Sequence, residues 1–237
     1  MKALDVGLGV REALDHPAEG RVVAVYSRAA YLQFPGGLLA VTSARAPAGP
    51  LHLRYPVLPA LRPGAPVWTD GFRLTGPGWA VTLDAPTWVG ELSPPAPPVI
   101  AAPDLAELAG LAARLGGRGP GLTPAGDDVL AGALLATRAR CGPAAEPALS
   151  AVAASVLTTD PAAAFLAWAA RGQCIEPAHA VLLALAAGDE HRARAAAARL
   201  VAVGASSGAA LLAGLRLGLG RPSGTGACWI SCRAVRI

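Results

Sequence analysis

Lysine is almost absent from this chain of 237 residues. Lys2 is the only lysine among 20 basic residues, and no two of the arginines are adjacent in sequence. A nucleic-acid interface needs clustered positive charge against the phosphates, and single-stranded sites add aromatic side chains that stack on bases. Aromatic residues make up only 5% of the chain. The formal net charge of +4 therefore gives no reason to expect a nucleic-acid partner.

The sequence also lacks a long apolar run. A long uncharged stretch, residues 200–215, is interrupted by glycines and serines and is shorter than the 18 or so apolar residues of a membrane-spanning helix. Charges at Asp5, Arg11 and Asp15 interrupt the N-terminal segment, where a signal peptide would be apolar. We expect a cytoplasmic protein without a membrane partner.

Cysteine and histidine are scarce, with four of each. The cysteines are Cys141, Cys174, Cys228 and Cys232, and none has a histidine or second cysteine pair at the spacing of a zinc site. We expect reduced thiols, with the last two as packing residues. The histidines are isolated in the sequence, so we do not expect them to form a metal site.

Charged residues are few as well, at 15%, whereas hydrophobic residues reach 53%. Such a chain has little charge with which to cover its surface, and a large apolar surface is usually buried against another protein. We therefore expect a homo-oligomer or an assembly with other subunits.

Residues 20–92 are typical of a β domain. Short apolar or alternating runs, bounded by turn-forming residues, occupy residues 21–26, 37–42, 51–54, 66–68, 72–74 and 79–83. Asp70-Gly71 and Gly76-Pro77-Gly78 separate such runs and are hairpin signals, since glycine accepts the positive φ of a tight turn. This spacing predicts a small N-terminal barrel or sandwich over residues 1–93.

The proline-rich segment 93–98 predicts the domain junction, because proline suits neither a central strand nor a helix interior. The apolar period then becomes helical, with Asp104 as a cap for the first helix. Further helices are expected over residues 124–140, 146–157, 161–171, 177–187, 190–203 and 208–217. The sequence thus predicts an α+β protein: a β barrel or sandwich followed by an all-helical bundle over residues 99–237.

The strongest local feature is the glycine-rich segment 116–128, which opens a helix. Glycine at positions 117, 119 and 121 lets the backbone approach a ligand, Thr123 is a good N-cap, and Pro124 suits the first helical position. Free amides at a helix start favour an anion such as phosphate or carboxylate. The predicted ligand-binding residues here are Arg118, Gly119, Gly121, Thr123 and Gly126.

Asp127 and Asp128 follow in the first turn and project about 100° apart, because an α-helix has 3.6 residues per turn. One carboxylate can act as a general base or hold Mg²⁺ bridged by a substrate phosphate, while its neighbour orients the loop. Both are therefore candidate catalytic and metal-binding residues. The structural alternative is that first-turn acids merely interact with the helix dipole, worth about 0.3–1 kcal/mol each.

Two other helix starts are weaker candidates. Ser206, Ser207 and Gly208 precede or open the last long helix and can complete an anion site with the first. Thr158 and Thr159 stand before Asp160, which we expect to be the N-cap of its helix. Thr159 is included among the predicted ligand-binding residues.

The segment 117–128, GRGPGLTPAGDD, resembles the GLGPGLTPSGDD signature of a bacterial domain-of-unknown-function family. That family includes a subunit of oxamate carbamoyltransferase from anaerobic allantoin breakdown. Softer similarities lie at Gly49-Pro50-Leu51, Trp88, Thr158-Thr159 and 204–208. The resemblance implies transfer of a carbamoyl group between carbamoyl phosphate and oxamate, by an enzyme of several subunits of which this chain is one.

The chain departs from the family pattern at several polar positions. Alanine stands at Ala125 and Ala163, where serine is usual, at Ala205, where histidine is frequent, and at Ala210, where aspartate is common. Each change deletes a polar group, which has a chemical consequence if the site is buried. The alternative is therefore a non-catalytic binding or scaffold subunit with a degenerate site. An independent Mg²⁺-dependent hydrolase is a third reading, for which the sequence offers few further ligands.

Overall fold

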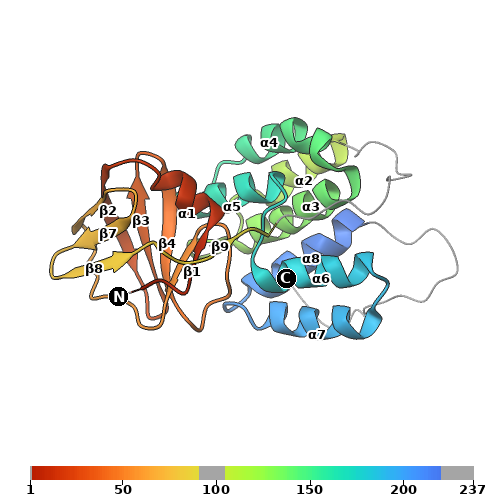
Figure 1. Cartoon of the computed structure of the whole chain (residues 1–237). Helices are drawn as coiled ribbons and strands as arrows, with labels where there is room; N and C mark the ends of the chain where they lie inside the picture. The colour runs from red at the N-terminus through yellow and green to blue at the C-terminus, as the bar shows by residue number, and fades with distance from the viewer. Residues whose placement is uncertain (1, 91–104, 220–237) are drawn as a thin grey trace, which may run out of the picture. The chain divides into compact units, whose positions relative to one another are not determined.

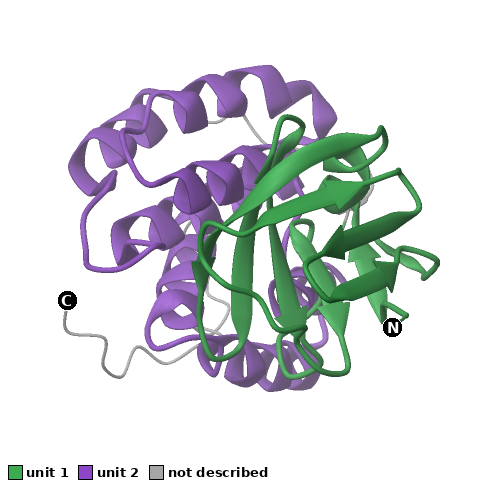
Figure 2. Ribbon diagram, turned by 90° about the vertical axis from the view of Figure 1, so that its left-hand side faces the viewer, with its two compact units in different colours: residues 1–90 green, residues 91–237 purple. Residues whose placement is uncertain are grey.

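The computed structural model describes residues 2–90 and 105–219 (Figure 1). The chain divides into two compact units, Met1–Gly90 and Glu91–Ile237 (Figure 2). The predicted junction at 93–98, the cap at Asp104, and Cys228 and Cys232 lie outside the described residues. None of the helices in the described ranges is long and apolar enough to cross a membrane.

The first unit is a curled sheet of nine strands in the order β8-β7-β6-β2-β3-β4-β5-β1-β9. The strand order begins with β8 and ends with β1 and β9. An isolated bridge between Lys2 and Thr82 links the segment before β1 to β8. The elements are β1 (Asp5–Gly7), α1 (Leu8–Ala13), β2 (Ala18–Val25), β3 (Ala29–Phe34), β4 (Gly37–Ser43), β5 (His52–Tyr55), β6 (Pro66–Thr69), β7 (Arg73–Gly76), β8 (Trp79–Thr82) and β9 (Thr87–Trp88). The predicted α+β class, with its N-terminal β unit, is confirmed.

Alternation along the strands forms the core of this unit. Side chains on β3 and β4 alternate between the two faces of the sheet. Those on the core face are nearly inaccessible to solvent: Leu32 and Phe34 of β3, and Leu39 and Val41 of β4. The β6–β7 hairpin turns at Gly71, which has φ +88°, and the Asp70 side chain accepts hydrogen bonds from two amides of the turn. The short strand β1, the helix α1 and the strand β3 were not predicted. Their runs are short or rich in alanine, so the sequence signal is weak.

The second unit is entirely helical in its described part. Its elements are α2 (Leu105–Leu115), α3 (Ala125–Cys141), the 3-10 turn η1 (Pro143–Ala145), α4 (Glu146–Ala154), α5 (Asp160–Ala170), α6 (Glu176–Ala186), α7 (Glu190–Val201) and α8 (Ser207–Leu219). The glycines at 172, 188 and 204 adopt positive φ where helices end. The predicted helices therefore form, and the helical bundle is confirmed.

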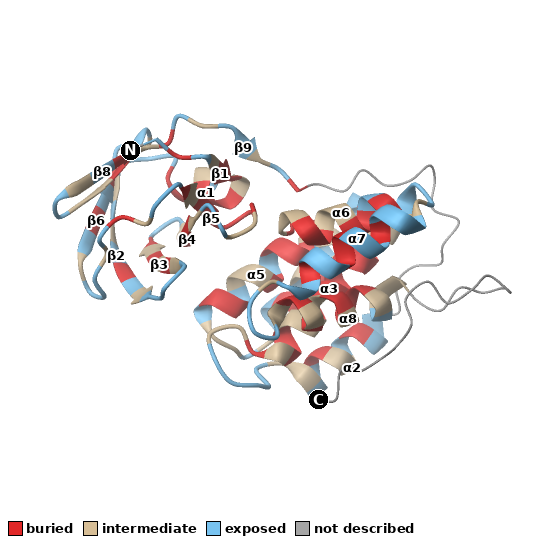
Figure 3. Ribbon diagram, turned by 90° about the horizontal axis from the view of Figure 1, so that it is seen from below, coloured by how far each residue is buried: buried red, intermediate tan, exposed pale blue. Residues whose placement is uncertain are grey.

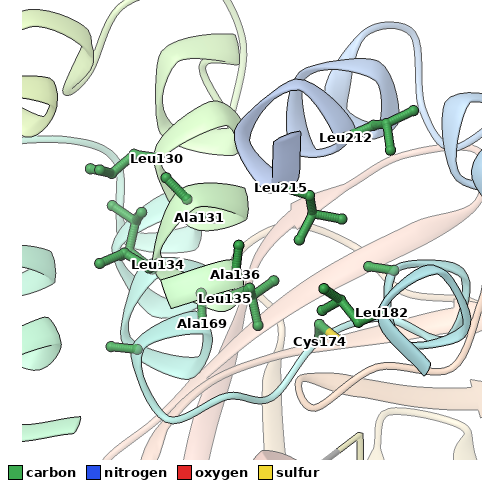
Figure 4. Close-up of a cluster of buried hydrophobic side chains, with 14 of the residues drawn as sticks. Leu130, Ala131, Leu134, Leu135, Ala136, Ala169, Cys174, Leu182, Leu212 and Leu215 are labelled. Carbon is green, nitrogen blue, oxygen red and sulfur yellow. The ribbon is translucent and has the colours of Figure 1, made fainter. Parts of the chain in front are cut away.

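Helix α3 is the centre of this bundle. All of its residues from Leu130 to Arg138 are buried, and Figure 3 colours α3 by this burial. Its leucines and alanines face α5, α6 and α8, and Figure 4 shows Leu134 and Leu135 beside Ala169, Leu182 and Leu215. A helix that is buried on every side needs small and apolar residues throughout, which explains the high alanine content.

Helices α3 and α8 pack backbone against backbone. A Cβ added at Gly132 would overlap the Leu211 carbonyl, one at Gly214 would overlap the Val129 carbonyl, and one at Gly218 would lie 2.6 Å from the Ala133 carbonyl oxygen. Residue numbers rise together along the two helices, so the helices are parallel. Their N-termini therefore lie at the same end of the bundle.

Candidate functional site

Three helix starts meet at the glycine loop, which we define as residues 116–124. The Thr123 hydroxyl lies 3.1 Å from the Ser207 hydroxyl at the start of α8. The Thr159 hydroxyl, before α5, donates to the Leu122 carbonyl. The loop itself leads into α3. Each helix start carries partial positive charge, so together they form a region suited to an anion.

Asp127 is almost completely buried, with 2% of its surface exposed. One carboxylate oxygen accepts a hydrogen bond of 2.8 Å from the Gly117 amide, and the other accepts one from the Thr158 hydroxyl. The side chain therefore joins the beginning of the loop to the segment before α5. Its oxygens are used inside the protein, so Asp127 is placed to orient the loop.

Asp128 has a different environment. Its Oδ2 atom is buried and has no hydrogen-bond partner among the described residues. Burial raises the pKa of Asp128 to about 7, the charge of Asp127 raises it as well, and a hydrogen bond from Ser207 partly offsets the rise. A carboxyl group that titrates near neutral pH can both accept and donate a proton under cellular conditions.

The Ser207 hydroxyl contacts both Thr123 and Asp128, so the structure brings these three predicted residues together. Thr123 is not the N-cap of α3: Pro124 occupies that position, with φ −52° and ψ 137°, and Ala125 is the first helical residue. The predicted start was therefore one residue early. The Thr123 hydroxyl is directed to Ser207 instead of capping its own helix.

The other predicted residues of α8 have separate positions. Ser206 is exposed, and its carbonyl accepts a hydrogen bond from the Ala210 amide. Gly208 is buried, and a Cβ there would overlap the Leu200 carbonyl. Gly208 thus allows α8 to pack closely against the end of α7, and Ser207 is the residue of this segment that faces Asp128.

Two glycines of the loop differ in what lies next to them. Gly119 and Gly121 are both exposed and have positive φ, at +125° and +93°. A Cβ at Gly119 would lie 2.8 Å from the Ala125 amide nitrogen, whereas one at Gly121 would meet nothing within 4 Å. A side chain at Gly119 would crowd the first amide of α3, which has no hydrogen-bond partner within residues 2–90 and 105–219.

Arg118 is exposed on the loop, and its backbone is fixed at both ends. Its amide donates to the Leu115 carbonyl, and its carbonyl accepts from the Gly126 amide. Gly126 is buried, and a Cβ there would overlap the Leu115 carbonyl. Gly126 therefore serves the contact between α2 and α3, and its amide is used by the protein.

The start of α5 was predicted incorrectly in one respect. Thr159, not Asp160, is the N-cap, and its hydroxyl accepts a hydrogen bond of 3.3 Å from the Ala162 amide. Asp160 is instead the first residue of the helix and is exposed. Thr158, a weak candidate in the sequence, is the residue that reaches Asp127. The only sequence signal for that contact is two threonines before a helix start.

The carboxylates do not form a cluster in the described residues. No group of three or more His, Cys, Asp or Glu side chains there is arranged to hold a metal ion. Of the predicted pair, Asp128 retains an unpartnered oxygen, whereas the oxygens of Asp127 accept hydrogen bonds from the protein. A Mg²⁺ ion at this site would therefore need oxygen ligands from Asp128, substrate and water.

Comparison with known proteins gives one match. The family model described as oxamate carbamoyltransferase subunit AllH matches residues 115–219, from the end of α2 to the end of α8. No curated protein and no solved structure matches the chain. The matched region contains the glycine loop, both aspartates and the three helix starts that surround them. This helical region, a little under half of the chain, is similar to the AllH family of oxamate carbamoyltransferase subunits.

Proposed function

We propose that this chain is a substrate-binding and catalytic subunit of a carbamoyltransferase that uses oxamate or a similar small carboxylate amide with carbamoyl phosphate. The family description supports a role as a subunit, and hence partner subunits. The convergence of helix starts on one loop supports an anionic ligand. The observation that carries the proposal is Asp128, a buried carboxyl with a pKa of about 7 and an unpartnered oxygen at that convergence.

The two ends of oxamate match different parts of the site. Its carboxylate needs hydrogen-bond donors, which the Ala125 amide provides, joined by the Thr123 hydroxyl when it turns away from Ser207. Arg118 adds a positive charge on the exposed loop. The amide group of oxamate has a carbonyl oxygen and N–H donors, so Asp128 can donate to it when protonated and accept from it when ionised. An analogue without the amide should therefore bind less well than oxamate.

The proposed reaction forms a bond between the amide nitrogen of oxamate and the carbonyl carbon of carbamoyl phosphate. The bond from that carbon to the phosphate oxygen breaks, and inorganic phosphate leaves. The nitrogen loses one proton, which the Asp128 carboxylate accepts as general base. In the reverse direction the protonated Asp128 returns this proton to the leaving nitrogen. A pKa near 7 suits both directions, because neither protonation state is rare.

Mg²⁺ is compatible with the site as a partner of the phosphate. Asp128 would hold the ion together with oxygens of the substrate phosphate and water. The ion would supply positive charge to the leaving phosphate. Mg²⁺ would favour the ionised form of Asp128, so added Mg²⁺ should lower its apparent pKa.

Turnover by the assembled enzyme tests the proposal. The chain and its partner subunits are mixed with carbamoyl phosphate, and phosphate release is measured with and without oxamate. We expect release that depends on oxamate and falls by about 10²–10⁴-fold in Asp128→Asn, the usual range for loss of a general base. Asp84→Asn is the matched control, because Asp84 is exposed and belongs to the other unit.

The scaffold alternative predicts a different result. A degenerate subunit would leave oxamate-dependent turnover unchanged in Asp128→Asn, since another subunit would then carry the chemistry. Equal turnover by the wild-type complex and the Asp128→Asn complex would therefore refute the catalytic role of this chain. A complex that turns over only with an intact Asp128 would exclude the scaffold.

A further inference from the structure

We propose that Asp127 is a positioning residue, which fastens the beginning of the glycine loop to the segment before α5 and thereby holds the loop over the start of α3. Its effect on ligand binding rests on the proposed function, whereas its effect on the loop rests on the contacts alone. The proposal separates the two neighbouring aspartates: Asp128 reacts, and Asp127 keeps the surrounding backbone in place.

The hydrogen bonds of Asp127 define this role. A buried carboxylate is tolerated when its oxygens are satisfied, and here the donors come from two segments that are far apart in sequence. The Gly117 amide is ten residues before Asp127, and the Thr158 hydroxyl is 31 residues after it. One side chain therefore connects the loop, α3 and the start of α5.

Gly117 lies where the loop depends on this connection. It has φ +67°, and a Cβ on it would lie 2.6 Å from the Leu157 carbonyl oxygen. The loop backbone thus runs directly along the segment that carries Thr158. Two further hydrogen bonds hold the rest of the loop. The Gly126 amide donates to the Arg118 carbonyl, and the Thr159 hydroxyl donates to the Leu122 carbonyl. Loss of the Asp127 connection should loosen the first half of the loop while the second half stays attached.

The experiment uses the full-length chain and three variants. Thr158→Val removes one donor to Asp127, Thr158→Ser restores it, and Asp127→Asn keeps the shape, since its amide can donate to the Thr158 hydroxyl while its oxygen accepts from Gly117. Loop opening is measured as trypsin cleavage of the bond after Arg118, relative to cleavage after the exposed Arg28 of the other unit. Oxamate affinity is measured by calorimetry across pH 5–9.

We expect Thr158→Val to speed cleavage after Arg118 by about tenfold and to weaken oxamate binding by about tenfold, each corresponding to one hydrogen bond. Thr158→Ser should return both values to those of the wild type. Asp127→Asn should leave cleavage near the wild-type rate, because its side chain can still make both hydrogen bonds. Recovery in Thr158→Ser would not follow if Thr158 served only to fill space.

Unchanged cleavage and unchanged oxamate affinity in Thr158→Val would overturn the positioning role. Failure of the proposed function looks different: the wild type would bind no oxamate at any pH, while Thr158→Val still sped cleavage after Arg118. Circular dichroism melts of each variant identify global unfolding, and Thr158→Ser retains a test if Thr158→Val does not fold.

Discussion

Two helix pairs in the second unit are built in opposite ways. Helices α6 and α7 follow one another through a tight loop at Gly188 and are antiparallel, so their dipoles oppose. Arg199 of α7 forms a two-point ion pair with Glu176 of α6 at 2.9 Å. Helices α3 and α8 are parallel, touch through glycines, and place Asp128 beside Ser207 where both begin.

The difference separates stability from function. In the antiparallel pair every feature favours folding, because opposite charges meet on the surface and the dipoles compensate each other. In the parallel pair the two positive helix ends repel each other, and a carboxyl group is buried with an oxygen left unpartnered. An anion here would relieve the repulsion between the helix ends, and an N–H donor on the same ligand would satisfy the unpartnered oxygen. This is the physical basis of the proposed site.

The largest expected effect comes from breaking the parallel pair. Gly214→Ala places a Cβ against the Val129 carbonyl, so the helices must move apart. We expect a loss of about 3 kcal/mol or more in the free energy of unfolding, as for other overpacked core sites. Urea denaturation measures this loss.

Gly188→Ala is the control. Its positive φ strains an alanine, but a Cβ there meets nothing within 4 Å. The expected loss in the free energy of unfolding is therefore only about 1 kcal/mol. Equal losses would contradict backbone contact between α3 and α8.

The second effect concerns Asp128 and pH. Its folded pKa of about 7 lies above the ordinary value of 3.8, so its stabilising contribution is complete below pH 3.8 and is lost as the pH rises through 7. Asp128→Asn should therefore be more stable than the wild type at pH 8, and the gain should exceed the gain at pH 5 by about 3 kcal/mol. Urea denaturation of both proteins at the two pH values gives the difference directly. A gain that is independent of pH would show that Asp128 titrates normally.

The third effect concerns two glycines of the glycine loop. Gly119→Ala should weaken oxamate binding by about tenfold, because the new methyl group covers the Ala125 amide and removes one donor. Gly121→Ala carries a similar backbone strain and meets no atom, so its oxamate affinity should stay within about twofold of the wild type. Calorimetry on the folded variants distinguishes them. The proposed donor is wrong if both variants bind oxamate equally.

The smallest effect is expected at the antiparallel pair. Glu176→Gln removes the ion pair with Arg199, whose side chain is 55% exposed. A surface pair of this kind contributes less than about 1 kcal/mol to the free energy of unfolding. Oxamate affinity should not change, because the side chains of Glu176 and Arg199 bond to each other and not to Asp128 or Ser207. A large loss of affinity would mean that α6 and α7 contribute to the site.

Much of the architecture could be predicted from the sequence. The period of apolar residues located the helices, and turn chemistry located the β6–β7 hairpin at Asp70-Gly71. The parallel arrangement of α3 and α8 was not predictable, because Gly132, Gly214 and Gly218 carry no pattern that names their partners. The sheet order was equally beyond reach, since β4 and β5 pair in parallel through a connection with no helix or strand of its own.

The sequence named several residues that the structure brings together at the glycine loop, but not their contacts. The glycine loop, both aspartates and the serines before α8 were identified because helix starts rich in glycine favour anions. The sequence offered only as one option that one aspartate reacts while its neighbour orients the loop. Neighbouring residues on a helix face different surroundings, which only the tertiary structure defines. The capping role of Thr159 was missed for a similar reason: Asp160 is an equally good cap by residue type, and contact with Leu122 decides between them.

The most direct test of the account is the pH dependence of oxamate binding to the full-length chain. The carboxylate of oxamate stays ionised from pH 5 to 9, so a change in affinity over this range reports on the protein. We predict that the wild type binds oxamate most tightly below pH 7 and loses affinity as Asp128 ionises, whereas Asp128→Asn binds equally well throughout. A wild-type affinity that does not depend on pH, or an Asp128→Asn variant with the same pH dependence as the wild type, would contradict it.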